Sequence, residues 1–185
     1  MTDWPVREFA PPSDDTILVE AARNGDRAAY GRLYDRYARV IHGILLTRVP
    51  PSEVDDLVQE VFLQAMPRLG SLRDAARFGA WLSAIARNRA NDFYRRSRPA
   101  TELTESLVAE KIEDRTATSS QMAEASAILE AIRTLPDAYR ETLILRLVEG
   151  MTGPEIAART GLAPGSVRVN LHRGMQQLRE KLGAS

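Results

Sequence analysis

The chain contains no cysteine. This absence excludes a disulfide framework, a thiol nucleophile and any zinc or iron-sulfur site with cysteine ligands. Only two histidines are present, His42 and His172, and they lie too far apart in the sequence to predict a metal site. There is no glycine-rich phosphate loop, and Asp55 and Asp56 alone do not make a metal or acid-base site. We therefore expect no catalytic residue, no metal and no cofactor, in a protein that is not an enzyme.

Aromatic residues and long apolar runs are also scarce. Aromatics make up 6% of the chain and β-branched runs are short, which argues against a large sheet, whereas 44% hydrophobic residues are enough for packed cores. No apolar run approaches the roughly 18 to 20 residues that span a membrane, and the N-terminus has no signal-peptide pattern. We expect an all-α, cytoplasmic protein with no membrane insertion.

The formal net charge is zero, but the charges are unevenly distributed. Residues 71–98 contain seven Arg and two Asp, and residues 151–182 contain five basic and two acidic residues. Residues 99–127 contain six acidic and two basic residues, and residues 49–66 contain four acids and no base. Two basic segments thus alternate with two acidic ones, so the neutral total does not argue against nucleic-acid binding.

The spacing of apolar residues predicts two small helical domains joined by a flexible linker. Residues 1–15 are proline-rich and predict a mobile tail, and residues 16–98 form the first domain. Residues 99–121 are acidic and rich in Ser and Thr, which is typical of a linker, and residues 122–185 form the second domain.

Three helices are predicted within the first domain. The first spans about residues 28–48 and the third about residues 76–96. The second starts at Ser52, where the spacing resembles a capping box. The middle helix has a single apolar stripe, made by Val54, Leu57, Val58, Val61, Phe62 and Ala65.

The C-terminal sequence MTGPEIAARTGLAPGSVRVNLHRGMQQLREKL has the pattern of a helix-turn-helix. Thr152 and Glu155 are spaced for a capping box, and Gly161 and Leu162 supply the tight turn. The second helix begins after Ala163, which offers no side-chain cap. Its buried stripe is predicted from the steps of three and four between Val167, Leu171, Met175, Leu178 and Leu182.

The amino end of this second helix is polar. A recognition helix meets base edges with its N-terminal residues, and Arg and Asn suit guanine and adenine in the major groove. We expect DNA contacts from Pro164, Gly165, Ser166, Arg168, Val169, Asn170, His172 and Arg173. The alternative is a solvated basic helix that merely closes a small helical domain.

Two further segments resemble a known family. DDLVQEVFLQA (residues 55–65) and FGAWLSAIARNRANDFYRRSR (residues 78–98) occur before the helix-turn-helix in the order found in extracytoplasmic-function (ECF) RNA polymerase sigma factors. The resemblance implies that residues 16–98 are sigma region 2 and residues 122–185 are sigma region 4. It implies core RNA polymerase as a partner, through the clamp helices of the largest subunit and the flap of the second. It also implies promoter DNA and an anti-sigma factor as partners.

For the segment DDLVQEVFLQA, the resemblance implies polymerase contacts from Asp55, Asp56, Gln59 and Glu60, with Phe62 supporting them from the core. An acidic helix face suits a basic partner surface. An ordinary solvated helix face is the alternative interpretation.

The resemblance implies that the Arg-rich third helix reads the minus-ten promoter element. Arg side chains can neutralise phosphates, while amides and aromatic rings can contact unstacked bases. The residues concerned are Arg77, Phe78, Trp81, Arg87, Asn88, Arg89, Asn91, Arg95 and Arg96. The resemblance places a flipped base near residues 70–77. The alternative for Phe78 and Trp81 is a plain core position.

We thus expect a sigma factor that directs promoter-specific transcription initiation at the minus-ten and minus-thirty-five elements under anti-sigma control. The alternative is an autonomous helix-turn-helix regulator whose N-terminal domain senses a ligand or dimerises.

Overall fold

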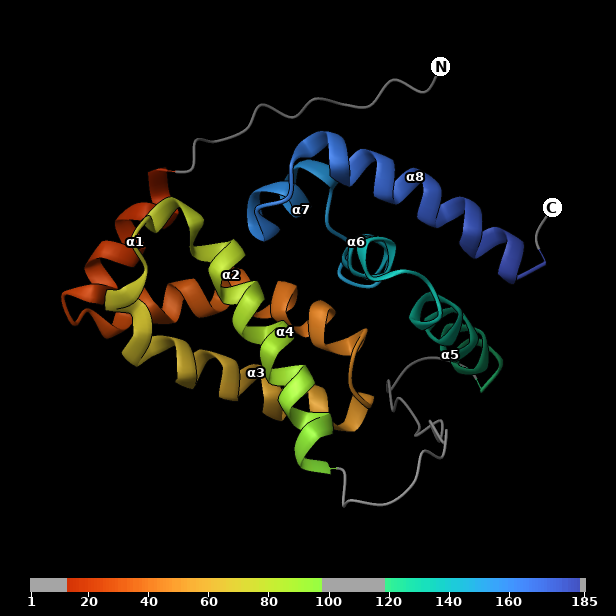
Figure 1. Ribbon diagram of the computed structural model, residues 1–185, viewed down its shortest axis with the longest axis horizontal. Helices are drawn as coiled ribbons and strands as arrows, with labels where there is room; N and C mark the ends of the chain where they lie inside the picture. Colours follow the sequence, from red (N-terminus) through yellow and green to blue (C-terminus); the bar gives the residue numbers. More distant parts are fainter. Residues whose placement is uncertain (1–12, 98–118, 184–185) are drawn as a thin grey trace.

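The computed structural model describes residues 13–97 and 119–183. Within these residues the chain forms eight α-helices, two 3-10 helices and no strand, which confirms the expected all-α fold (Figure 1). Most of the predicted tail and linker lies outside the described residues. Helix α1 nevertheless already includes residues 13–15, and helix α5 includes residues 119–121, so both helices begin earlier than predicted.

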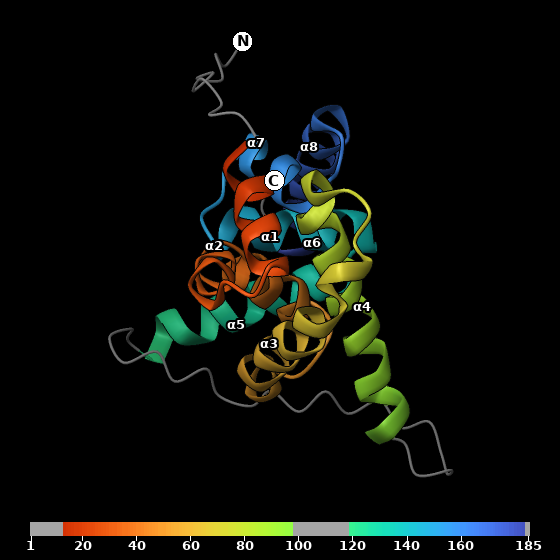
Figure 2. The same cartoon turned by 90° about the vertical axis from the view of Figure 1, so that its left-hand side faces the viewer.

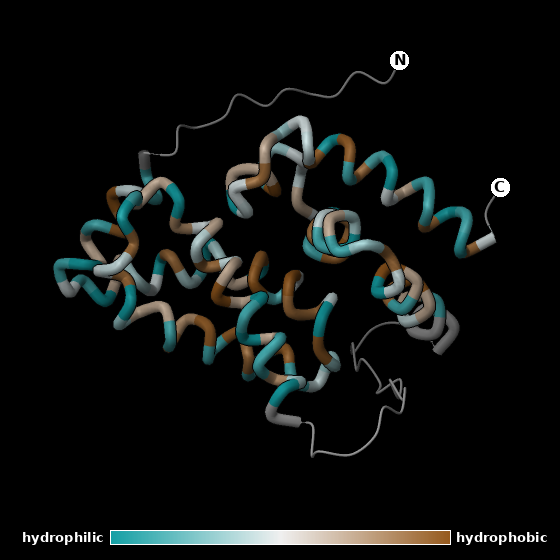
Figure 3. The backbone as a smooth tube through the Cα atoms, viewed as in Figure 1, coloured by the Kyte–Doolittle hydropathy of each residue, from teal (hydrophilic) through white to brown (hydrophobic). Residues whose placement is uncertain are grey.

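The N-terminal module, residues 13–97, packs four α-helices around one core. Its elements are α1 (Ser13–Arg23), α2 (Arg27–Leu46), α3 (Pro51–Ala65), η1 (Met66–Ser71), η2 (Ala75–Arg77) and α4 (Phe78–Ser97). The Asp26 carboxylate caps α2 by accepting hydrogen bonds from the backbone N–H groups of Ala28 and Ala29. All six apolar residues predicted to form the stripe of α3 are buried, as expected. Figure 3 shows hydrophobic and hydrophilic residues alternating along these helices.

The capping-box-like start predicted at Ser52 is wrong. The N-cap of α3 is Pro50, and no side chain caps the helix. Pro51 occupies the first turn, where its missing N–H costs nothing because that group has no partner within the helix.

The C-terminal module, residues 119–183, contains the helix-turn-helix. Its elements are α5 (Ser119–Arg133), α6 (Asp137–Leu147), α7 (Gly153–Thr160) and α8 (Pro164–Lys181). The capping box of Thr152 and Glu155 is confirmed, and so is the missing side-chain cap at Ala163. The prediction that Leu182 is buried is wrong: it is 44% exposed, because α8 ends at Lys181 and runs beyond its neighbours.

The two modules pack directly against each other. Helix α2 contacts α6, and α4 contacts α7, so segments far apart in the sequence lie side by side (Figures 1 and 2). Glycines permit the close approach: a Cβ at Gly79 would lie 2.2 Å from the carbonyl oxygen of Arg159, and one at Gly161 would lie 2.6 Å from the Cβ of Ala80.

No helix within residues 13–97 and 119–183 is both long and apolar enough to cross a lipid bilayer.

Candidate nucleic-acid interface

The amino end of α8 presents a polar face to solvent. Val167, 1% exposed, anchors the first turn in the core and thereby sets the rotation of the helix. Asn170 is half-buried. The other residues predicted to contact DNA are all exposed: Pro164, Gly165, Ser166, Arg168, Val169, His172 and Arg173. This face therefore has the polarity expected of a recognition helix.

The turn before α8 fixes how this face is presented. Gly161 ends α7 with φ of 74°, in the left-handed region that glycine adopts without a steric penalty. The Thr160 hydroxyl donates a 2.6 Å hydrogen bond to the Ile156 carbonyl oxygen. Since Ala163 leaves the first N–H groups of α8 without a side-chain cap, these groups can donate to a DNA phosphate.

The two arginines on this face carry uncompensated charge. Within the described part of the chain, neither Arg168 nor Arg173 forms an ion pair. Their guanidinium groups are therefore available to guanine edges or phosphates without first breaking an internal contact.

Helix α4 has a second polar face. Asn88, Asn91 and Arg95, three of the predicted DNA contacts, are exposed and follow one another at steps of three and four, so they share one side of the helix. Arg95 pairs with Asp92 at 2.9 Å, but both side chains reach solvent and such a surface pair is weak. Arg77 is also exposed, just before the start of the helix. The side chain of Arg96 lies outside the described residues.

Two of the predicted phosphate contacts are engaged inside the protein. Arg87 donates to both carboxylate oxygens of Glu141 in the C-terminal module, each at 2.9 Å. Arg89 is 7% exposed and pairs with Glu60 on α3. In this arrangement neither guanidinium faces solvent freely.

The two aromatic residues differ in their surroundings. Phe78 is completely buried, with its ring centroid 5.0 Å from that of Tyr37 in an edge-to-face arrangement. Trp81 is half-buried and lies 5.9 Å from Phe78, between centroids. Phe78 is thus a core residue here, whereas Trp81 retains an exposed edge.

Helix α3 presents the predicted acidic face. Asp55, Asp56 and Gln59 are exposed, and Glu60 is 44% exposed in its side chain despite its pair with Arg89. Phe62 is buried, 3% exposed, beneath them. Its carbonyl oxygen accepts a 2.5 Å hydrogen bond from Tyr30, whose pKa burial raises to about 12.

Comparisons with known proteins agree with this division into modules. The family model for sigma-70 region 2 matches residues 33–99, and that for sigma-70, region 4, matches residues 125–178. The RNA polymerase sigma factor CarQ of Myxococcus xanthus is 32% identical over 173 residues, which cover 89% of this chain and 95% of CarQ. The chain belongs to the ECF RNA polymerase sigma factors.

Other sigma factors are similar to this one. The ECF RNA polymerase sigma factor BldN of Streptomyces coelicolor is 35% identical, over 87% of this chain and 63% of BldN. The ECF RNA polymerase sigma-E factor of Escherichia coli K12 is 29% identical, over 91% of this chain and 94% of that protein.

A solved structure shares the arrangement of this sigma factor. CnrH, in complex with the cytosolic domain of CnrY, aligns with a TM-score of 0.61 and 28% identity over 93% of this chain and 99% of CnrH. The sigma factor RpoE from Bartonella quintana, in complex with the anti-sigma factor NepR, shows the same fold at 19% identity, with a TM-score of 0.57 over 84% of this chain and 98% of RpoE.

Two exposed apolar residues that were not predicted from the sequence lie beside the acidic face of the sigma factor. Leu63, on α3, and Met66, directly after it, are 70% and 46% exposed. They continue the line of Asp55 and Gln59 at steps of four and three, so they lie along the same side of the helix. Helical spacing alone could have found both, because each lies one turn from another residue of that line.

Proposed function

We propose that this sigma factor contacts core RNA polymerase with the exposed face of α3, the minus-ten element with α4 and the minus-thirty-five element with α8. The observation that carries the proposal is the polar amino end of α8, with Arg168 and Arg173 free of internal ion pairs among the described residues. It follows the tight turn of a helix-turn-helix that matches sigma-70 region 4. The matches to both sigma regions support this assignment of contacts to the helices.

Affinity for a promoter is expected to depend on polymerase. Each region alone offers a small DNA-binding face, and two weak contacts held at a fixed spacing gain affinity through effective concentration. The experiment is run-off transcription with core polymerase on a promoter library, alongside DNA binding by the free protein. Specific initiation by the holoenzyme and weak binding by the free chain are expected. Equally tight promoter binding without polymerase, or no pull-down of core polymerase, would instead favour an autonomous regulator.

Replacing Arg168 with alanine is expected to lower discrimination at the minus-thirty-five element. If the exposed guanidinium pairs with a guanine, the loss is about 1 to 3 kcal/mol for the preferred base. Binding of the holoenzyme to promoters that vary at each upstream position measures this loss of discrimination. Arg179→Ala, at an exposed position in the last turn of α8 and outside the proposed DNA contacts, is the matched control. A uniform loss across all upstream sequences would assign Arg168 to a phosphate instead.

Asp56→Lys is expected to weaken binding to core polymerase. The carboxylate is exposed on α3, so reversal of its charge places a cation on a face that we propose meets a basic surface. Competition with the unmodified protein for a limiting amount of core polymerase measures the effect, and the urea midpoint should not change. Glu180→Lys, the same charge change at an exposed site on α8, is the control. Equal competition by both variants would contradict the proposal.

We also propose control by a protein of the anti-sigma class. CnrH, similar to this chain over 93% of its length, was solved in complex with the cytosolic domain of CnrY, which supports a protein partner for this chain as well. Co-purification of the tagged chain from its own host, with and without added core polymerase, tests for a partner that polymerase displaces.

A further inference from the structure

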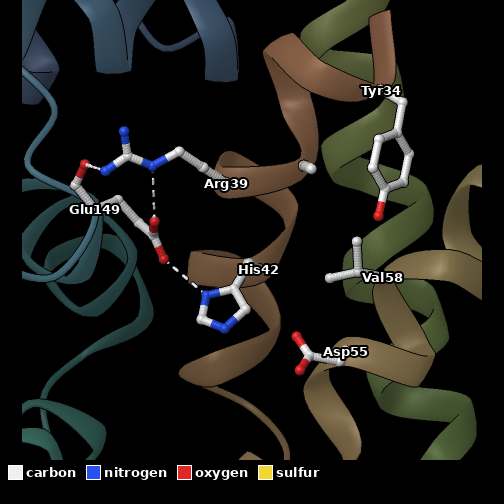
Figure 4. Close-up of a pocket in the computed structure, with 7 residues that line it drawn as sticks. Tyr34, Arg39, His42, Asp55, Val58 and Glu149 are labelled. Carbon is white, nitrogen blue, oxygen red and sulfur yellow. Dashed lines mark hydrogen bonds and ion pairs between the residues drawn. The ribbon is translucent and has the colours of Figure 1, made fainter. Parts of the chain in front are cut away.

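Two polar surfaces of the protein differ in whether their groups are already paired. In the pocket between α2 and the segment before α7, His42 Nδ1 lies 2.7 Å from the Glu149 carboxylate, which also accepts a hydrogen bond from Arg39 (Figure 4). On the exposed face of α8, by contrast, His172 and Arg173 make no side-chain hydrogen bond or ion pair within the described part of the chain. The face of α8 therefore keeps its polar groups available to a partner.

A single apolar side chain lies in the middle of this face. Val169 is 45% exposed, and it is the only large hydrophobic residue exposed on α8, a helix that the structure describes from end to end. Its neighbours at steps of three and four are Gly165, Ser166, His172 and Arg173, all exposed and none with an apolar side chain. Val169 is thus an isolated apolar group on a polar surface.

The packing of α8 keeps Val169 on the outward side. Val167 is 1% exposed, and a Cβ at Gly174 would lie 3.0 Å from Leu143 Cδ1 on α6, so the side of α8 that carries Val167 and Gly174 is held closely against its neighbours. At 3.6 residues per turn, Val169 lies about 200° around the helix from Val167, which is nearly opposite. Its side chain therefore adds little to the core of region 4.

Helix formation does not account for a valine at this position either. Valine has a lower helix propensity than Ala, Arg, Lys or Glu, because its branched side chain is restricted within a helix. The isopropyl group of Val169 also meets water in the free chain, which is unfavourable for an apolar group. A partner that buries this group would remove that cost.

The major groove offers one kind of apolar group to such a side chain. Base edges there present hydrogen-bond donors and acceptors, and thymine adds a C5 methyl group. Valine can neither donate nor accept, so a purine edge placed against it would lose water without gaining a partner. Gly165, one turn before Val169, has no side chain to hold the helix away from the bases, and a Cβ there would meet nothing within 4 Å in the described chain. A thymine methyl group is therefore the favourable contact for Val169.

We propose that Val169 is a specificity-determining residue of region 4, and that its isopropyl group packs against the C5 methyl group of one thymine in the minus-thirty-five element. The proposal rests on the proposed function, because it takes α8 as the helix that enters the major groove. It adds an apolar contact to the hydrogen bonds that Arg168 and Arg173 can form with neighbouring bases or phosphates. The upstream element should accordingly contain an A·T pair at one fixed position.

The test uses the holoenzyme and a promoter selected by run-off transcription from the library. Each upstream thymine, on either strand, is replaced singly by deoxyuridine, which lacks only the methyl group. One replacement should lower the affinity of the holoenzyme about fourfold, the effect of one methyl group that is no longer buried. In the Val169→Ala holoenzyme the same replacement should leave the affinity unchanged. Comparison of the four combinations separates the contact from any effect of deoxyuridine on the duplex itself.

Val148→Ala is the matched control. Val148, at the end of α6, is 51% exposed and lies outside the proposed DNA contacts, so its holoenzyme should keep the preference for thymine. The urea midpoint of Val169→Ala should equal or exceed that of the unmodified chain, because Val169 is exposed and alanine favours the helix. Unfolding then does not explain a lost preference.

A second comparison adds the methyl group to a different base. When the thymine found by deoxyuridine replacement is changed to cytosine, 5-methylcytosine restores the methyl group without restoring the O4 acceptor of thymine. The unmodified holoenzyme should bind the 5-methylcytosine promoter about fourfold more tightly than the cytosine promoter, and Val169→Ala should bind both equally. Equal binding by the unmodified holoenzyme would overturn the proposal.

The possible results separate this proposal from the proposed function. A holoenzyme that discriminates between upstream sequences but is indifferent to every thymine methyl group overturns this proposal alone, and so does a methyl preference that persists in Val169→Ala. Affinity that does not depend on the upstream sequence at all overturns both. A methyl preference at one upstream position that disappears in Val169→Ala and persists in Val148→Ala supports the contact.

Discussion

Glu60→Lys is expected to lower the free energy of unfolding of region 2 by about 3 kcal/mol, near the lower end of the range for breaking a buried ion pair. Arg89 is 8% exposed in its side chain and depends on Glu60, and its Nη1 is already buried without a partner among the described residues. A lysine at position 60 would leave that guanidinium buried, unpaired and beside a second cation. The cost stays near the lower end because Glu60 itself is 44% exposed.

Urea denaturation followed by circular dichroism measures this effect. Asp56→Lys makes the same charge change on the same helix at an exposed site, and its midpoint should match that of the unmodified chain. Arg89→Met should cost no more than about 1 kcal/mol, because it removes the buried charge and leaves Glu60 to water. Equal midpoints for Glu60→Lys and Asp56→Lys would show that the pair contributes little. The resemblance to the family implies only a polymerase contact for Glu60. The structure shows that Glu60 also pairs with the buried Arg89.

Phe78→Ala is expected to destabilise region 2 by about 3 to 5 kcal/mol, the usual cost of removing a fully buried aromatic ring. The ring is completely buried at the junction of η2 and α4, in contact with Tyr37 and Trp81. Its removal would leave a cavity beneath the face that we assign to the minus-ten element. Promoter opening should therefore fall as a consequence of the lost fold.

Thermal and urea unfolding of Phe78→Ala, compared with Trp81→Ala, test this interpretation. Trp81 is half-buried, so its replacement should cost less stability and, if its exposed edge meets a base, should reduce promoter opening more than its stability loss explains. Phe78→Leu keeps part of the apolar volume, so its stability should lie between those of the Phe78→Ala chain and the unmodified chain. A Phe78→Ala protein with an unchanged midpoint and defective promoter opening would assign that ring to DNA.

Much of the fold could be predicted from local patterns. The stripe of α3 is buried as its periodicity predicts, and the capping box at Thr152 and the turn at Gly161 place the helix-turn-helix correctly. These features depend on residues within one or two turns of each other, where backbone geometry relates spacing directly to direction. The errors lie at helix ends: Ser52 is not the cap of α3, and Leu182 lies beyond its packing neighbours.

The candidate faces were only partly predictable. Periodicity indicates which side of α4 is polar, and Asn88, Asn91 and Arg95 are indeed exposed there. It does not distinguish them from Arg87 and Arg89, which are just as polar and lie within the same two turns. The pairing of Arg87 with Glu141 on α6 and of Arg89 with Glu60 on α3 makes that distinction.

The sequence by itself determined the all-α fold, the helix-turn-helix and the orientation of α8, because each follows from apolar spacing and turn chemistry within a short segment. Only the tertiary structure decided which arginines of α4 are free. Glu141 is 54 residues from Arg87 and Glu60 is 29 residues from Arg89, and no local pattern relates such partners. The close approach at Gly79 likewise exists only once α4 and α7 meet. A pairing across that distance depends on how whole helices pack, and packing is a property of the assembled chain.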